Sequence, residues 1–350
     1  MEFLTRIPWQ KPLFEFSYED KITMMGSCFV ENIGKIMEEN KFTVDINPFG
    51  TLYNPSSVAN GLRMLLRPEP FTVKDLFQQG GVYHSFSHHS RFSSTSEEEC
   101  LDRINSRLSS SADFLQKATR LIITWGTASI YRLKSNGTVV ANCHKLPERL
   151  FQWERLSVDD IVNDWRALLL SLWEQNQEIK ILLTVSPIRH WKDGAHENQL
   201  SKATLLLAAE ALQEAYPERI DYFPSYELLM DELRDYRFYA DDMLHPSPLA
   251  IDYIWQRFID HFLSRESTIL LKEWGSIRKA IDHKPFQPDS KAYRQFILQT
   301  LLKMKRIREK MPSFDLLKEM VSLMSKLEQE DGVLNSRNSK DYRGRSKTVD

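Results

Sequence analysis

The sequence predicts an α/β fold: a three-layer αβα sandwich of the flavodoxin-like type around a five-stranded parallel sheet, with a helical appendage at the C-terminus. Short β-prone segments near residues 22, 42, 120, 179 and 220 alternate with segments of helical periodicity. The third and fourth of these segments are almost continuously apolar, which is typical of strands covered on both faces. Right-handed crossovers then favour the strand order 2-1-3-4-5.

The first half of the chain is expected to supply two strands and their helices. The first strand ends at Gly26 and the second covers 42–46. Ser57 is predicted to cap a helix that runs to Arg67. Residues 71–118 are predicted to be an insertion, irregular with some strand at first and helical from about residue 97, where Ser96 and Glu99 form a capping pattern.

The second half is expected to supply three more strands. Asn136-Gly137 predicts a hairpin after the third strand, and Ser157 begins a helix. The remaining predicted elements are a strand at 179–185, a polar loop at 186–198, a helix at 200–216, a strand at 220–223 and a helix that ends near 263.

The domain organisation follows from where the strand segments stop. Residues 1–263 are expected to form the sheet domain and 264–330 a purely helical extension, whose last helix starts at Pro312. The polar residues 331–350 are predicted to be disordered.

Composition excludes several functional classes. Lys and Arg total 46 against 48 for Asp and Glu, a net charge of -2 that gives no reason to expect a nucleic-acid partner. No apolar run approaches the ~20 residues of a membrane span. The N-terminus has no signal-peptide pattern, and three cysteines are no disulfide framework, so a cytoplasmic protein is expected.

The first chemical feature is Gly26-Ser27-Cys28-Phe29, between a strand and a helix. A nucleophile there would lie at a helix N-terminus, whose positive end lowers a thiol pKa and whose N–H groups stabilise an oxyanion. A tight turn with a small buried cysteine is the structural alternative.

The second feature is Asp242-Met-Leu-His245, in the loop before the last helix of the sheet domain. A carboxylate three residues from a histidine can hold the imidazole in one tautomer and leave its other nitrogen as a general base. Because the carboxyl ends of parallel strands share one edge, the pair and the 26–28 loop are expected to meet there. An exposed loop with a local hydrogen bond is the alternative.

Other histidines and the loop after the fourth strand are candidates for substrate binding. His89 and His144 are interpreted as lining a pocket, with surface positions as the alternative. No cofactor and no metal are expected, because adjacent strand residues Cys143 and His144 point to opposite faces. The polar loop contributes Arg189, His190, His196 and Glu197 as further candidates for substrate binding. The alternative is that these four residues form a solvated surface.

These segments together resemble the GSCFA domain family, a distant branch of the SGNH/GDSL esterase superfamily. The resemblance covers about residues 20–262. It rests on Gly26-Ser-Cys-Phe29, Asn47-Pro-Phe-Gly50, Trp125-Gly-Thr127, Asn142-Cys-His-Lys145, Ser186-Pro-Ile-Arg-His190, His196-Glu-Asn198, Tyr222-Phe-Pro-Ser-Tyr-Glu227 and Asp242-x-x-His245-Pro246.

The resemblance implies acyl-transfer chemistry with Asp242 and His245 as catalytic residues. Where the superfamily has Gly-Asp-Ser, this chain has Gly-Ser-Cys, so Cys28 takes the nucleophile's place, and a one-residue slip would assign it to Ser27. Gly50 and Gly126 fall where other blocks supply oxyanion donors. The third block's Asn is missing, since position 128 is Ala, and Asn142 is a candidate replacement.

The expected function is therefore an esterase or acyltransferase that forms an acyl-enzyme. Its partner would be a small-molecule or carbohydrate ester, with an O-acylated carbohydrate as one candidate. The alternative is a binding module on the same fold that has lost catalysis. The sequence predicts no oligomeric state.

Overall fold

The computed structural model describes residues 4–283, 285–286 and 290–327. The chain divides into two compact units, Met1–Leu263 and Ser264–Asp350. The segment 331–350, expected to be disordered, lies outside the described residues.

A five-stranded parallel sheet forms the centre of the first unit, in the order β10-β9-β5-β1-β2. Its strands are β1 (Lys21–Gly26), β2 (Thr43–Ile46), β5 (Arg120–Trp125), β9 (Lys180–Val185) and β10 (Ile220–Phe223). All neighbouring strands run parallel. The predicted fold class and the order 2-1-3-4-5 are confirmed.

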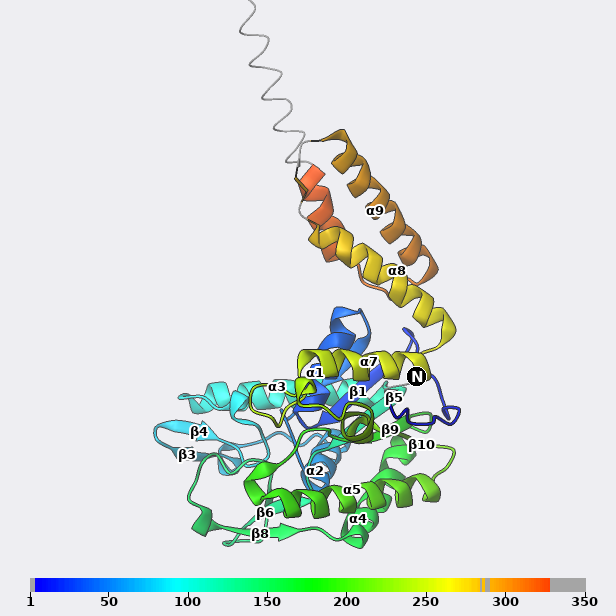
Figure 1. Ribbon diagram of the computed structural model, residues 1–350. Coiled ribbons are helices and arrows are strands. Elements are labelled where there is room, and N and C mark those ends of the chain that lie inside the picture. The colour runs from blue at the N-terminus through cyan, green and yellow to red at the C-terminus, as the bar shows by residue number, and fades with distance from the viewer. Residues whose placement is uncertain (1–3, 284, 287–289, 328–350) are drawn as a thin grey trace, which may run out of the picture. The chain divides into compact units, whose positions relative to one another are not determined.

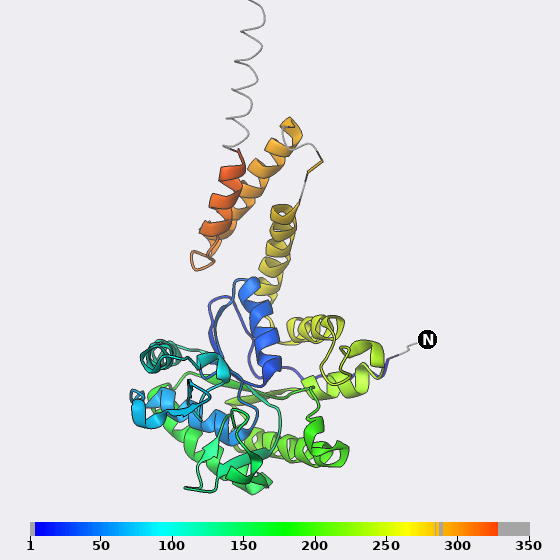
Figure 2. The same ribbon diagram turned by 90° about the vertical axis from the view of Figure 1, so that its left-hand side faces the viewer.

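Helices cover both faces of this sheet (Figures 1 and 2). On one face lie α1 (Cys28–Glu39) and α7 (Pro248–Phe262), and on the other α2 (Pro55–Leu66), α4 (Val158–Gln175) and α5 (Ala195–Ala215). The helix α3 (Glu97–Gln116) packs beside α2.

Strand β5 shows why its sequence is apolar throughout. Leu121, Ile123 and Trp125 pack into the core formed with α2, α4 and α5. Ile122 and Thr124 point the other way, toward α1 and α7. Because successive strand residues alternate between faces, a strand buried on both sides shows no polar alternation.

Several element boundaries differ from the prediction. Asn54, not Ser57, caps α2: its Oδ1 accepts a hydrogen bond from the Ser57 N–H (2.8 Å), and Pro55 takes the first helical position. Helix α5 begins at Ala195, before the predicted residue 200, because Gly194 has a φ of 87° and separates it from a short turn at Trp191–Asp193.

Two small antiparallel sheets flank the main one. The predicted hairpin is formed by β6 (Ser129–Leu133) and β7 (Val139–Val140), and an unpredicted strand, β8 (Phe151–Arg155), extends it. Inside 71–95, β3 (Phe77–Gln79) and β4 (Val82–His84) pair. After β10 the chain forms the short helix α6 (Ser225–Glu227) and a π-helical turn at Leu228–Glu232.

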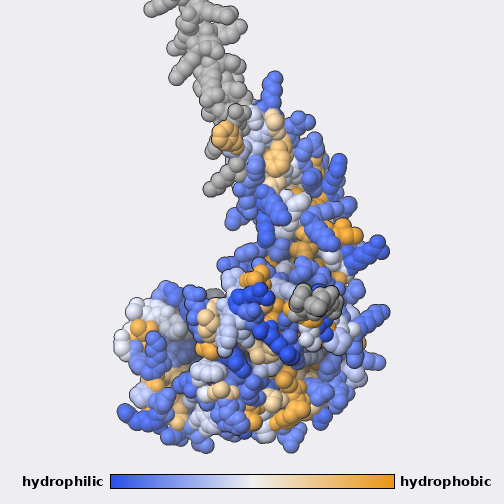
Figure 3. All heavy atoms as spheres, in the orientation of Figure 1, coloured by the Kyte–Doolittle hydropathy of each residue, from blue (hydrophilic) through white to orange (hydrophobic). Residues whose placement is uncertain are grey.

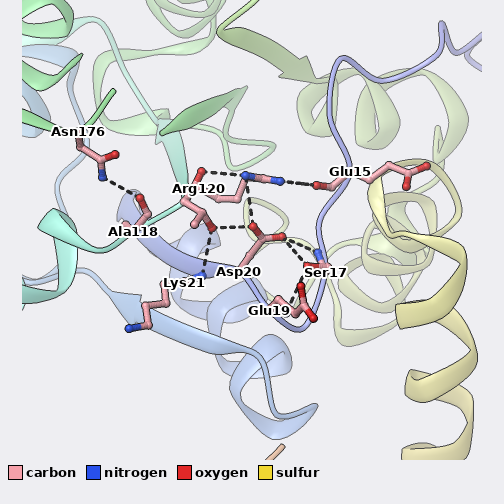
Figure 4. Close-up of polar contacts among 9 residues, drawn as sticks. Glu15, Ser17, Glu19, Asp20, Lys21, Ala118, Arg120 and Asn176 are labelled. Atoms are coloured by element: carbon pink, nitrogen blue, oxygen red, sulfur yellow. Dashed lines mark hydrogen bonds and ion pairs between the residues drawn. The ribbon is translucent and has the colours of Figure 1, made fainter. Parts of the chain in front are cut away.

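Polar contacts fix the N-terminal segment at the edge of the sheet where β1 and β5 begin (Figure 4). The buried Asp20 accepts a hydrogen bond from the Thr119 hydroxyl (2.6 Å) and pairs with the Arg120 guanidinium (3.3 Å). Arg120 also donates to the Glu15 carbonyl (2.9 Å). These contacts hold β1 in register beside β5, at the edge opposite the carboxyl ends of the strands.

Gly26 allows β1 to end in close contact with β5. Its φ is 141°, and a Cβ placed on it would lie 2.1 Å from the Thr124 carbonyl oxygen. We expect Gly26→Ala to destabilise the first unit by at least about 3 kcal/mol, measured by denaturant unfolding. Gly275→Ala is the control, since Gly275 lies inside a helix and, apart from that helix's own backbone, nothing among the described residues lies within 4 Å of an added Cβ, so the change should be neutral or slightly stabilising.

The second unit is helical in its described residues. It contains α8 (Arg265–Asp282), α9 (Lys291–Lys310) and a helix over 317–327. The prediction that Pro312 starts this last helix was wrong: the chain turns at 312–313 and buries Phe314 first. Apolar and polar side chains are interspersed on its visible surface (Figure 3). Among the described helices of the whole chain, none has the length and hydrophobicity needed to span a bilayer.

Candidate active site

The site lies at the carboxyl edge of the sheet, where the loops after β1, β5 and β9 meet. A cavity of ≈ 440 Å³ opens there. Its lining includes Cys28 from the start of α1, His245 from the loop before α7, and Asn142 from the segment after β7. This is the edge at which ligands bind in doubly wound sheets.

The turn from β1 into α1 is built from backbone contacts. The Gly26 N–H donates to the side-chain oxygen of Asn47 (2.9 Å), and the Ser27 N–H donates to the Thr124 carbonyl (3.1 Å). Cys28 is the first residue of α1 and is half-buried in the cavity. The N–H groups of Cys28 and Phe29 lie close enough to hydrogen-bond to the sulfur.

Asp242, His245 and Cys28 form a chain of contacts. The Oδ2 of Asp242 lies 2.5 Å from Nδ1 of His245, and Nε2 of His245 lies 4.0 Å from the Cys28 sulfur. The other carboxylate oxygen of Asp242 accepts the backbone N–H groups of Leu244 and His245, both at 2.9 Å. The expected contact between Asp242 and His245 is present, and the imidazole faces the Cys28 thiol.

The pKa shifts of Asp242 and Cys28 favour a neutral thiol that gives its proton to His245 during the reaction over a preformed thiolate–imidazolium pair. The backbone N–H groups of His245 and Leu244, together with the His245 ring, lower the pKa of Asp242 to about 2. At Cys28, burial raises the thiol pKa, Glu31 adds to the rise, and the local N–H groups oppose it. The expectation that the helix N-terminus would lower the thiol pKa was wrong, because the loss of hydration outweighs the helix terminus.

The pH dependence of Cys28 alkylation follows from its raised pKa. Only the thiolate is nucleophilic, and a pKa above the ordinary value leaves less thiolate at pH 7. We expect iodoacetamide to label Cys28 slowly at pH 7 and progressively faster as the pH rises past the usual thiol range of about 8–9. Peptide mass spectrometry separates Cys28 from the other cysteines. Rapid labelling at pH 5 would instead indicate a thiolate–imidazolium pair.

Ser27 has a different environment from Cys28. Its side chain is 1% exposed, and its hydroxyl oxygen is buried without a hydrogen-bond partner in the described part of the chain. It occupies the N-cap position of α1 but does not cap the helix with its side chain. Within the described residues, the Ser27 hydroxyl therefore contributes no hydrogen bond to the turn.

The structure does not support the two glycines named as oxyanion donors. The Gly50 N–H already donates to the Asn47 carbonyl (2.8 Å), and the Gly126 N–H donates to the Tyr53 carbonyl (2.7 Å). Both groups are therefore used in fixing loops at the edge of the sheet.

Two asparagine amides are better placed to donate into the cavity. Asn142 uses its side-chain oxygen to accept the His144 N–H (2.8 Å), and Asn54 uses its own to cap α2. Neither side-chain NH₂ has a protein acceptor within the described residues, and both residues line the cavity. Asn54 was missed from the sequence, although the Asn-Pro step at a helix start marks it as a cap.

The proposed substrate-binding residues divide into two groups. His89, Arg189 and His190 line the cavity. His144 does not: its Nε2 bonds to the Ser85 carbonyl (2.8 Å) and its ring packs on His84.

His196 and Glu197 also lie outside the cavity lining. They occupy the first turn of α5, where Glu197 pairs with Arg155 (2.7 Å). They were interpreted as part of a loop because the start of α5 was placed too late in the sequence.

Lys202 lies buried beneath the site and was also missed. Its ammonium donates to the carbonyls of Gly126 and Ser186, both at 2.7 Å, and so joins the ends of β5 and β9. Burial lowers its pKa to about 7. A lysine in a helix is usually solvated, but Lys202 falls on the apolar face with Leu205, Ala209 and Leu212, and this spacing was the available signal.

In the described ranges, no group of three or more His, Cys, Asp or Glu residues has positions suited to holding a metal ion. His190 and His88 are neutral at pH 7, because burial lowers the pKa of each to about 3.

The fold and site define an α/β protein with a cysteine, a histidine and an aspartate in contact at the carboxyl edge of a parallel sheet. The chain belongs to the GSCFA family, which matches residues 21–258. Residues 274–329 match the C-terminal domain of GSCFA domain proteins. The helical extension, which the sequence resemblance did not cover, therefore also has a family counterpart.

Similarity beyond the family is distant. No curated protein matches the chain. A solved structure described as that of "a putative platelet activating factor from Streptococcus pneumonia" is 13% identical, with a TM-score of 0.35, over 69% of this chain and 84% of that one. Similarity at this level says nothing about a shared substrate.

Proposed function

We propose that this protein is an esterase or acyltransferase that forms an acyl-enzyme on Cys28. The observation that supports this most directly is the chain of contacts from Asp242 through His245 to Cys28. A nucleophile next to a base that is itself oriented by a third group is the arrangement that covalent acyl transfer requires. The resemblance to SGNH/GDSL esterases belongs to the same proposal.

In the acylation step, Nε2 of His245 takes the thiol proton as the sulfur attacks the carbonyl carbon of the ester. The electron pair of the C=O bond moves to oxygen, and the tetrahedral oxyanion accepts hydrogen bonds from the backbone at Cys28 and from the amides of Asn54 and Asn142. The intermediate collapses when the C–O bond to the alcohol breaks and the alcohol takes the proton from His245.

In the second step, water or an acceptor hydroxyl attacks the thioester while His245 removes its proton. Water gives hydrolysis and an acceptor alcohol gives transfer, and both regenerate the free thiol. Asp242 remains ionised throughout, because its pKa of about 2 lies far below that of an imidazolium. Its charge stabilises the imidazolium that forms in each step.

Cys28 is preferred to Ser27 as the nucleophile on two grounds. The His245 ring contacts the Cys28 sulfur, and Cys28 lines the cavity, whereas the Ser27 side chain is almost fully buried. A buried hydroxyl could reach an ester carbon only after the turn rearranged.

Trapping the acyl-enzyme tests this proposal. The protein is mixed with an activated ester such as p-nitrophenyl butyrate, quenched in acid and analysed by intact and peptide mass spectrometry. We expect one butyryl group, on the peptide that contains Cys28. The matched control is Cys143→Ser, which removes the other cavity cysteine and should leave the adduct in place.

Other outcomes lead to different conclusions. An adduct on Ser27 would move the nucleophile by one residue. No adduct with any ester, together with tight binding of a ligand in the cavity, would favour the alternative of a binding module without catalysis.

A further inference from the structure

A second cavity adjoins the candidate active site. It measures ≈ 420 Å³ and is lined by residues of the loop after β9, the π-helical turn and the 234–244 segment. Arg189, Trp191 and the loop that holds Asp242 and His245 border both cavities. Arg189 therefore lines the cavity that contains Cys28 as well as the second cavity, and a molecule bound at Cys28 lies in a cavity bordered by its side chain.

The charged groups of the second cavity differ in whether they have partners. Arg234 pairs with Asp231 (2.9 Å), Asp235 with Arg237 (3.6 Å) and Asp242 with His245. Within the described residues, no carboxylate lies within ion-pair distance of Arg189. Its guanidinium is the charge of this cavity that is left without a counter-ion.

Arg189 also has a hydrogen-bond donor without an acceptor. Its Nε–H is buried and has no acceptor among the described residues. The guanidinium carbon lies 5.8 Å from the ring of Trp191, which is 49% exposed. Burial raises the pKa of Tyr226 and Tyr239, and the positive charge of Arg189 opposes the rise at both, which places the guanidinium close to these phenols.

From these contacts we infer that Arg189 binds an anionic group of the substrate, so that the preferred ester carries a carboxylate or a phosphate next to an apolar or ring-shaped body. A buried donor without an acceptor destabilises the free protein, and an oxyanion of the substrate would supply the missing acceptor. Carboxylate and phosphate both match the fork of a guanidinium, and Trp191 offers a face for the body. This inference rests on the proposed function, because it assigns the substrate class of that site.

Aryl acetates that differ in one meta substituent, anionic or neutral, test the inference. The three substrates are meta-acetoxybenzoate, its methyl ester and meta-acetoxyphenyl phosphate, with acetate release followed by NMR. We expect kcat/KM to be about tenfold to a hundredfold higher for an anionic ester than for the neutral one, as for a charge-assisted hydrogen bond. Arg189→Gln should remove most of this preference, with a much smaller loss on the neutral ester.

Controls separate charge from folding. Arg132→Gln removes a cation that pairs with Glu154 outside both cavities, and it should keep the wild-type preference. If Arg189→Gln does not fold, Arg189→Lys keeps the charge without the fork and should retain only part of the preference.

Binding in the absence of catalysis distinguishes this inference from the proposed function. In a Cys28→Ala background, calorimetry with meta-hydroxybenzoate, its methyl ester and phenyl phosphate reports the anion site alone. The anion that binds more tightly identifies the substrate as a carboxylate or a phosphate.

Binding that depends on Arg189 without cleavage of any ester would overturn the proposed function and support the anion site. Cleavage without an anion preference, or equal binding in Arg189→Gln, would overturn the anion site.

Discussion

Replacing Cys28 with alanine is expected to lower kcat for ester cleavage by at least about three orders of magnitude. In the proposed mechanism the sulfur supplies the bond that splits a difficult reaction into two easier steps, and Cys28 is the residue of the 26–29 turn that lines the cavity. The expected cost to the free energy of unfolding is small, because Cys28 is only half-buried at the first position of α1. Initial rates with an activated ester and a denaturant melt measure the two effects separately.

Ser27→Ala is the matched comparison, one residue away. It removes a hydroxyl that is buried without a partner, so the free energy of unfolding should stay constant or rise slightly. Most of the activity should remain. The reverse ranking of the two variants would identify Ser27 as the nucleophile, and full activity in both would exclude a covalent intermediate at this turn.

The fold was predictable because its pattern is local. Each strand of the sheet is a short apolar or β-branched segment, and the residues that begin the helices, such as Ser96 and Ser157, signal the boundaries directly. Errors arose where a boundary depends on backbone conformation. The start of α5 requires the positive φ of Gly194, and the strand β8 exists because it pairs with β6 across a long connection. Neither feature has a clear signature in its own segment.

The strand order determines which loops meet at the carboxyl edge of the sheet, and this part of the site could be predicted from the sequence. The carboxyl ends of β1 and β5 are adjacent in a 2-1-3-4-5 sheet, and the loop before the last helix returns to the same edge. That was sufficient to bring Cys28, Asp242 and His245 together. The proposed donors at Gly50 and Gly126 were not supported because hydrogen-bond use depends on tertiary contacts: their N–H groups hold neighbouring loops.

Burial accounts for the remaining differences. The thiol pKa of Cys28 is set by the loss of water more than by the helix terminus, and the extent of that loss is a property of the packed cavity. Lys202 is a similar case: its position on the apolar face of α5 is visible in the sequence, but its two carbonyl acceptors come from the ends of different strands.

Asp242→Asn is expected to lower kcat about 10²- to 10⁴-fold while leaving the loop intact. The asparagine oxygen can still accept the backbone N–H groups of Leu244 and His245 that shape the turn. The amide NH₂ that replaces Oδ2 is a donor, however, and cannot accept the Nδ1–H of His245. The imidazole would then carry its proton on Nε2, the nitrogen that receives the thiol proton in the proposed mechanism.

The comparison that isolates this effect uses three more variants and two substrates. His245→Ala should lose at least as much activity as Asp242→Asn, and the double variant should lose little more than His245→Ala, because the carboxylate acts through the imidazole. Asp164→Asn breaks an ion pair with Arg63 outside both cavities and should leave kcat almost unchanged. Activated aryl esters, whose leaving group needs no proton, should be less sensitive to the loss of His245 than alkyl esters. Equal losses on both ester types would mean that His245 acts only on the thiol, and additive losses in the double variant would show that Asp242 and His245 do not act as a unit.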